Sequence, residues 1–134
     1  MTNQELINLA LIKLRVIEAG VDASATDSAT TLGVLNRMMA EWRQRSMDVN
    51  WFAQDSLTDT APLPDYAEEG VAANLAVRAA SDFSAVVTQQ TYDEARDGKR
   101  TIANTLININ LDNADMSHLP QGEGKYSDYD ITTE

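Results

Sequence analysis

Hydrophobic side chains in the first half of the chain recur every three or four residues, in two blocks. At the start of the first block, Thr2 and Glu5 have the spacing of a capping box, in which each side chain satisfies an exposed backbone amide. Leucine, isoleucine and alanine residues follow with helical spacing, and Gly20 favours a left-handed helix stop. We therefore expect a first helix from Thr2 to about Gly20. Because it is apolar on nearly every side, it should lie between neighbouring elements.

The second block begins after residues 21–27, whose alanine, serine, threonine and aspartate content is typical of a turn. Either Thr26 or Asp27 can cap the helix that follows. The apolar positions of this second helix, which we expect in the core, are Leu32, Leu35, Met38, Met39 and Trp42.

The helical period disappears between Met47 and Pro64. Val49, Trp51 and Phe52 favour a strand, and residues 57–60 suit the return strand of a short hairpin. A lone hairpin is marginally stable, so it should pack against helices or another subunit. A long insertion is often an interaction element, and Trp51 and Phe52 are its candidate partner-binding residues.

Two further helices are predicted after this insertion. Pro64 and Asp65 suit the first turn of a third helix, whose many alanines let a neighbouring helix approach closely. A fourth helix should run from about Thr88 to Leu111. Gly98 in its middle costs about 1 kcal/mol relative to alanine, which indicates a bend or a tight contact there. The apolar stripe of the fourth helix is Thr88, Tyr92, Ala95, Lys99, Ile102, Leu106 and Ile109. The fold class is thus mostly α: a small bundle of about four helices with a short hairpin-like insertion over residues 47–64.

The periodicity ends in the last part of the chain. We expect residues 1–111 to form a helical domain and residues 112–134 an extended C-terminal arm. Fully extended, an arm of this size spans roughly 80 Å and could reach another protein. Five residues are spaced as anchors and are the arm's candidate partner-binding residues: Leu119, Pro120, Tyr126, Tyr129 and Ile131. An acidic, solubilising free tail is the alternative.

Composition narrows the function. The chain has no cysteine, which excludes a disulfide framework and a thiolate metal site. Its net charge of −11, without a basic run longer than two residues, disfavours a grip on DNA phosphates. An acidic surface suits a protein past which DNA slides without sticking, although the simpler interpretation is that the acidity keeps the chain soluble. Neither a membrane span nor a signal peptide is predicted, so we expect a soluble protein made in the cytoplasm.

Candidate chemistry is sparse. His118 is the only histidine, and no glycine-rich phosphate loop is present. We therefore assign no catalytic, cofactor-binding or metal-binding residue and expect no cofactor. Carboxylate pairs such as Asp93 and Asp97 leave a peptidoglycan hydrolase as the alternative function, because glycoside hydrolysis needs two carboxylates about 5–10 Å apart. A solvated helix face with ion pairs is the simpler interpretation of these residues.

Four short fragments, spread over nearly the whole chain, carry a family resemblance. They are residues 10–16 (ALIKLRV), residues 35–42 (LNRMMAEW), residues 63–66 with 73–78 (LPDY, ANLAVR) and residues 119–124 (LPQGEG). Their order and spacing resemble those of the packaged-DNA stabilisation proteins of short-tailed phages, also called tail accessory factors or head-completion adaptors. Ser46 departs from that pattern, since such proteins often have a glycine soon after the tryptophan.

The resemblance implies a virion structural protein rather than an enzyme. It implies a helical subunit of a head-to-tail adaptor, or connector, that assembles as a twelve-membered ring on the portal protein. Such a ring extends the DNA channel, helps retain packaged DNA and provides an attachment surface for tail nozzle or tail fibre proteins. DNA passes through without sequence-specific binding. The expected location is the head–tail junction of the virion.

Overall fold

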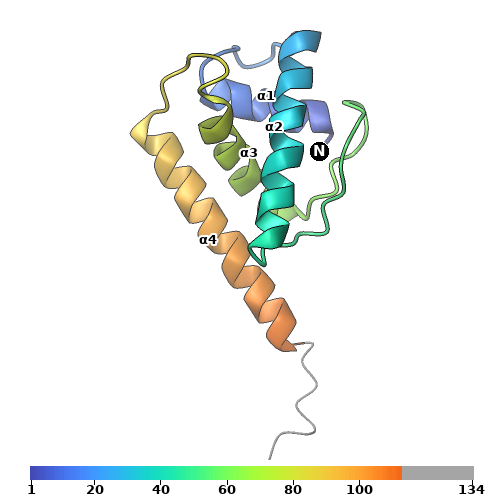
Figure 1. Cartoon of the computed structure of the whole chain (residues 1–134). Coiled ribbons are helices and arrows are strands. Elements are labelled where there is room, and N and C mark those ends of the chain that lie inside the picture. The colour runs from blue at the N-terminus through green and yellow to red at the C-terminus, as the bar shows by residue number, and fades with distance from the viewer. Residues whose placement is uncertain (113–134) are drawn as a thin grey trace, which may run out of the picture.

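The computed structural model describes residues 1–112, which form four helices (Figure 1). They are α1 (Asn3–Lys13), α2 (Ala25–Gln44), α3 (Asp65–Ala79) and α4 (Gln89–Asp112). No strand occurs within these residues. The expected class, a small bundle of about four helices, is confirmed. The predicted arm lies almost wholly outside the described residues.

The start of α1 forms as predicted. The Thr2 hydroxyl accepts a hydrogen bond from the Glu5 amide at 3.2 Å, and the Thr2 amide donates to the Glu5 carboxylate at 2.7 Å. This capping box holds the pKa of Glu5 below its ordinary value, and the main cause is the hydrogen bond that the Thr2 backbone amide donates to the Glu5 carboxylate.

The end of α1 was predicted wrongly. The helix stops at Lys13 rather than near Gly20, because Arg15 takes the left-handed conformation with φ of 60°. The Val16 amide then donates back to the Leu11 carbonyl at 3.0 Å, which completes a Schellman motif without glycine. The remaining residues up to α2 form a connection that packs partly against the core.

Helix α2 begins one residue before the earliest predicted cap, because the Ser24 hydroxyl accepts from the Asp27 amide at 3.1 Å. Its far end is a second Schellman motif, with Ser46 at φ of 63° and the Met47 amide donating to the Trp42 carbonyl at 2.9 Å. Ser46 thus occupies a conformation that glycine adopts most easily. The predicted apolar positions of this helix are all buried: Leu32, Leu35, Met38, Met39 and Trp42.

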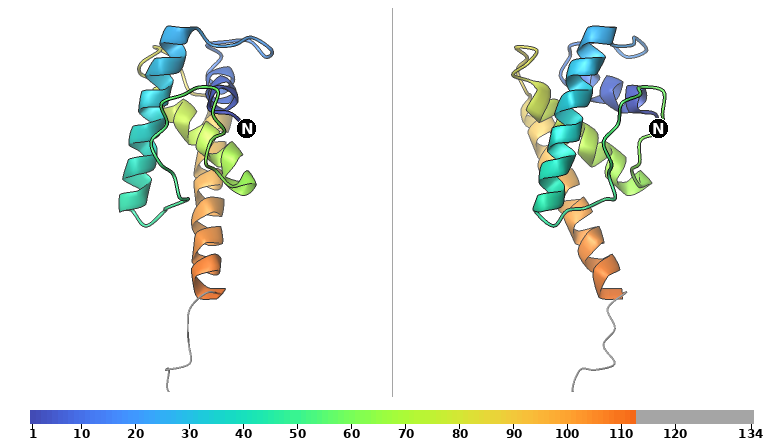
Figure 2. Two further views of the ribbon diagram at one scale, coloured as in Figure 1. Left: turned by 90° about the vertical axis from the view of Figure 1, so that its right-hand side faces the viewer. Right: turned by 45° about the vertical axis from the view of Figure 1, so that its right-hand side comes forward.

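The predicted hairpin does not form. Residues 45–64 run out and back as an extended loop beside α1 (Figure 2), and the two halves do not pair with each other. Instead, the Asn3 amide donates to the Asp59 carbonyl and the Gln4 amide to the Leu57 carbonyl, both at 2.9 Å. The first amides of a helix have no partner within it. In this protein the start of α1 takes the carbonyls that a return strand would have used.

Helices α3 and α4 make the largest contact between elements, and it is centred on two glycines. A Cβ atom placed on Gly98 would lie 2.4 Å from the Cα atom of Gly70. The tight contact expected at Gly98 is therefore present, with backbone against backbone. Asn74 strengthens the crossing by donating to the Ala95 carbonyl at 2.8 Å.

The predicted stripe of α4 is only partly buried. Ala95 and Ile102 lie in the core, but Tyr92 is 49% exposed and Thr91 is buried in its place. The predicted stripe advances 3.5 residues per turn, whereas a straight helix has 3.6, so the stripe drifts by about 20° per heptad. The drift brings Thr91 into the interface in place of Tyr92, whereas Ile109 is 43% exposed because the far end of α4 extends past the other helices (Figure 1).

Candidate assembly surface

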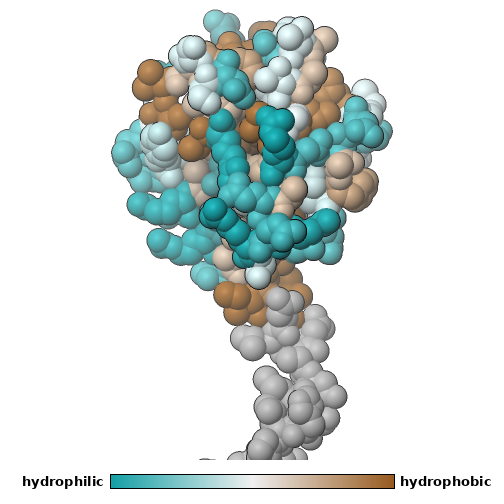
Figure 3. All heavy atoms as spheres, viewed as in Figure 1, coloured by the Kyte–Doolittle hydropathy of each residue, from teal (hydrophilic) through white to brown (hydrophobic). Residues whose placement is uncertain are grey.

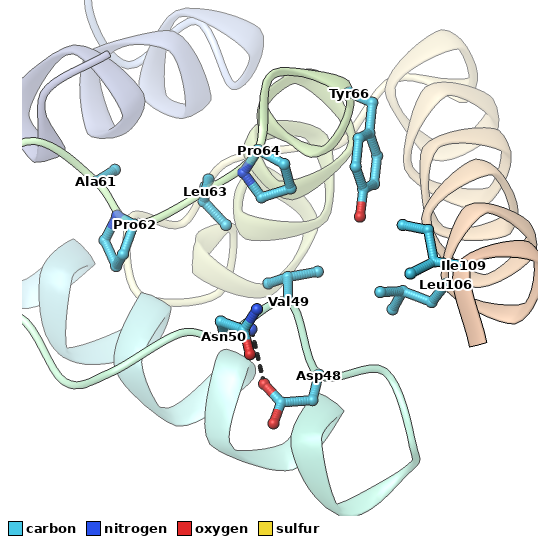
Figure 4. Close-up of a pocket in the computed structure, with 10 residues that line it drawn as sticks. All are labelled: Asp48, Val49, Asn50, Ala61, Pro62, Leu63, Pro64, Tyr66, Leu106 and Ile109. Carbon is cyan, nitrogen blue, oxygen red and sulfur yellow. Dashed lines mark hydrogen bonds between the residues drawn. The ribbon is translucent and has the colours of Figure 1, made fainter. Parts of the chain in front are cut away.

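A groove of about 650 Å³ lies beside the C-terminal half of α4 (Figure 4). Its walls come from three segments: residues 48–50, residues 61–64 with Tyr66, and Leu106 and Ile109 of α4. The Tyr66 ring reaches across the groove toward α4 (Figure 4). The groove therefore joins both ends of the extended loop to the last turns of the longest helix.

The lining of the groove is largely uncharged. Asp48 is its one carboxylate, and it accepts a hydrogen bond from the Asn50 amide at 2.8 Å and lies 3.4 Å from Nε of Arg43. Pro62 and Pro64 add rigid walls that lack an N–H donor. Such a groove suits apolar and aromatic side chains better than a phosphate or a metal ion.

Asn36 of α2 holds the extended loop in place. Its side-chain oxygen accepts from the Trp51 indole at 3.2 Å and from the Gln54 amide at 3.0 Å, and its nitrogen donates to the Gln54 carbonyl at 2.9 Å. A second clamp comes from Asn3, whose side chain donates to that of Gln54 at 3.0 Å. The spacing of apolar residues along the chain did not point to either asparagine. The sequence feature that could have indicated them is that each is a polar residue next to the apolar stripe of its helix.

The two aromatic residues predicted to bind partners face opposite ways. Trp51 is 4% exposed and belongs to the core cluster, whereas Phe52 is 64% exposed. Of these two residues, only Phe52 has a ring that a partner could contact without a change in the structure of the protomer. The five predicted anchors of the arm, Leu119, Pro120, Tyr126, Tyr129 and Ile131, lie outside the described residues. Partner binding stays a prediction for all seven.

The last turns of α4 extend beyond the other three helices (Figures 1 and 2). They expose apolar side chains, with Ile107 at 55% and Ile109 at 43%. Apolar atoms gather at this end of the molecule in the space-filling view, whereas the middle of that face is strongly polar (Figure 3). We call the groove-lining residues, together with Ile107 at the same end of α4, the basal surface.

The carboxylates considered for hydrolysis are engaged in ion pairs. Asp93 lies 3.3 Å from Arg96, one helical turn away, which confirms a solvated ion-paired face there. Glu94 instead pairs with Lys13 of α1 at 2.8 Å, and Glu69 of α3 lies 2.5 Å from the same ammonium. No pattern along the chain predicted this link between three helices.

The link shifts the pKa of both partners. Burial lowers the pKa of Lys13, but the hydrogen bonds that its ammonium donates to Glu69 and Glu94 outweigh burial, so the pKa stands above its ordinary value. The hydrogen bond from Lys13 holds the pKa of Glu94 below its ordinary value. Both shifts favour the charged pair.

Residues 1–112 hold no group of three or more histidine, aspartate or glutamate side chains placed to bind a metal ion. In the same range, no helix is long and apolar enough to cross a membrane.

A largely uncharged groove, an exposed helix end and a clamped loop characterise this small helical protein. The family model of the P22 tail accessory factor matches residues 1–133, and the chain therefore belongs to that family. No curated protein matches the chain. Membership confirms the resemblance found in the sequence. It assigns the chain a structural role in the phage virion, in contact with other virion components.

Proposed function

We propose that the chain is one subunit of an adaptor ring at the head-to-tail junction. It binds the portal protein and identical subunits, extends the DNA channel, helps retain packaged DNA and offers an attachment surface to tail components. The observation that carries this proposal is the match to the tail accessory factor family over residues 1–133. The basal surface adds support, because a ring subunit needs apolar area for its neighbours.

The charge of the chain also supports this role. Each copy carries a net charge of −11, so a ring of twelve copies surrounds its channel with strong negative potential. DNA phosphates gain affinity from lysine and arginine contacts that release counterions. Several of the cations are already paired with carboxylates, as Lys13, Arg78 and Arg96 show. DNA can therefore pass without sequence-specific binding.

Several weak contacts would hold the ring. Phe52 is the exposed aromatic side chain of the extended loop, and the indole of Trp51 next to it is hydrogen-bonded to Asn36, which keeps the loop in position. The arm adds its predicted anchors, from Leu119 to Ile131. Because all copies sit on one portal ring, weak single contacts add up through effective concentration.

Native mass spectrometry of the chain mixed with the purified portal tests the proposal. We expect one discrete complex with as many copies of the chain as the portal has subunits, while the chain alone gives no such ring. A variant with Phe52→Ser should bind less, and Val86→Ser, at another exposed apolar position, serves as its control. Absence of any complex with the portal over a wide concentration range would contradict the proposal.

A further inference from the structure

We propose that the groove beside α4 is the docking site of the chain's own C-terminal segment (residues 113–134) in the free protomer. The segment folds back on the same chain and places some of its apolar side chains between the extended loop and α4. This inference does not depend on the adaptor ring, because it concerns the chain before assembly.

Connectivity is the first argument. Ile109 lines the groove, and α4 ends at Asp112, about 4.5 Å further along the helix axis. The seven residues that follow Asp112, up to Leu119, can span about 23–25 Å when extended. The segment is therefore tethered at the edge of the groove with enough length to turn back. A short tether gives an effective concentration of about millimolar, which no separate partner reaches by dilute diffusion.

The chemistry of the two surfaces is the second argument. The groove offers aliphatic, proline and tyrosine walls, and its one carboxylate, Asp48, already has partners. The segment has apolar and aromatic residues separated by polar, glycine and mostly acidic charged residues, so its charged side chains can stay at the solvent rim while its apolar side chains enter. The apolar candidates are Leu119, Pro120, Tyr126, Tyr129 and Ile131.

Size is the third argument. At about 650 Å³ the groove is in the range of about 300–1,000 Å³ that holds a compact ligand. It can take a few side chains, not the whole segment. Docking therefore uses a short stretch, and the same side chains cannot hold a partner at the same time. Assembly through these residues then requires their release from the groove.

A single spin label tests the docking in the intact chain. The protein has no cysteine, so Ser127→Cys gives one site for a nitroxide next to Tyr126. We expect the amide signals of Val49, Leu63 and Leu106 to lose most of their intensity in the ¹⁵N-labelled, spin-labelled chain. Amides in the first turn of α2 should keep theirs, because α2 is about 30 Å long and the groove lies at its other end.

Matched variants and a mixing experiment decide among the outcomes. Ile109→Asp places a charge in the groove and should abolish the loss, whereas Ile107→Asp, exposed on the same helix outside the groove, should retain it. Both variants are checked for intact helical signal. Equal loss in the two variants would place the docking elsewhere and overturn the proposal. Full intensity throughout the spin-labelled chain that carries neither aspartate substitution would also overturn it.

A mixture of two samples identifies the occupant. One sample is the spin-labelled chain without ¹⁵N, and the other is the ¹⁵N-labelled chain that has no cysteine and no spin label. Signal loss in the ¹⁵N chain would mean that a second copy supplies the segment, and the docking within one chain would be wrong. Undiminished signals in that mixture, together with loss in the doubly labelled chain, support it. Portal binding is measured separately, so failure of this docking is distinguishable from failure of the adaptor function.

Discussion

Gly70 and Gly98 are in such close contact that neither α3 nor α4 leaves room for a side chain at Gly98. A Cβ atom built on Gly98 would lie only 2.4 Å from the Cα atom of Gly70. These two residues set the crossing of α3 and α4. Because α4 forms one wall of the groove and residues 61–66 lead into α3, the crossing also sets the width of the groove. The glycine pair therefore links the core to the basal surface.

Gly98→Ala should destabilise the protein. Alanine favours a helix by about 1 kcal/mol over glycine, but here its methyl group meets backbone that must shift, and overpacking costs about 1–3 kcal/mol. Urea unfolding measures the net loss. Gly33→Ala in α2 is the matched control, because its Cβ meets only the end of Arg37 at 3.4 Å, and it should stabilise. Equal effects of the two changes would show that α3 and α4 can separate freely.

Asn36→Ala should free the extended loop. It leaves the Trp51 indole and the Gln54 backbone without their partner, and an unpaired buried polar group costs about 1–3 kcal/mol. Hydrogen exchange at Gln54 should accelerate more than exchange in α3. Gln44→Ala, exposed at the end of the same helix, should change neither quantity. If hydrogen exchange at Gln54 were unchanged, the hydrogen bonds of Asn3 alone would be sufficient to hold the loop in place.

Lys13→Met should lower the stability of the protein at neutral pH. It should also make the stability fall less steeply as the pH is lowered. The pKa of Glu94 is lowered in the folded protein, so the pair stabilises fully above the ordinary value of 4.5 and this stabilisation is lost as the pH falls below it. Thermal unfolding from pH 7 down to pH 3 should show a flatter acid limb in the variant. Arg96→Met, which removes an exposed pair, should cost less than about 1 kcal/mol. An unchanged acid limb would mean that other carboxylates govern it.

Phe52→Ser should separate assembly from stability. The ring is 64% exposed, so its loss should change the free energy of unfolding by no more than about 0.5 kcal/mol. If Phe52 contacts the portal or a neighbour, binding to the portal should weaken about tenfold, which corresponds to about 1.4 kcal/mol. Val86→Ser, at a side chain that is 88% exposed, should leave binding unchanged. Equal loss in both variants would mean that replacing any exposed apolar side chain with serine weakens binding.

Ser46→Gly should stabilise the end of α2. Ser46 has φ of 63°, a conformation that costs a residue with a Cβ atom about 1 kcal/mol. The reverse change, Gly20→Ser at φ of 85°, should destabilise by a similar amount. Denaturant midpoints of the two variants should move in opposite directions. A fall in both would show that the Ser46 side chain has a role of its own.

The elements that depend on local pattern were largely predictable. The capping box of Thr2 and Glu5, the buried face of α2 and the start of α3 at Pro64 follow from spacing and capping chemistry. Helix ends at Arg15 and Ser46 were not, because residues other than glycine adopt the left-handed conformation there. Local sequence does not reveal when tertiary contacts offset that cost.

The amino-acid sequence by itself determined the helical class, the acidity, the absence of thiol chemistry and, through its ordered fragments, the family. Only the tertiary structure decided where the carbonyls of residues 57–59 go, that Trp51 is buried while Phe52 is exposed, and that residues 48–50 and 61–66 meet α4 to form a groove. The reason is physical. A period along the chain reports which face of a helix is apolar, whereas a surface built from three distant segments exists only once the helices have packed.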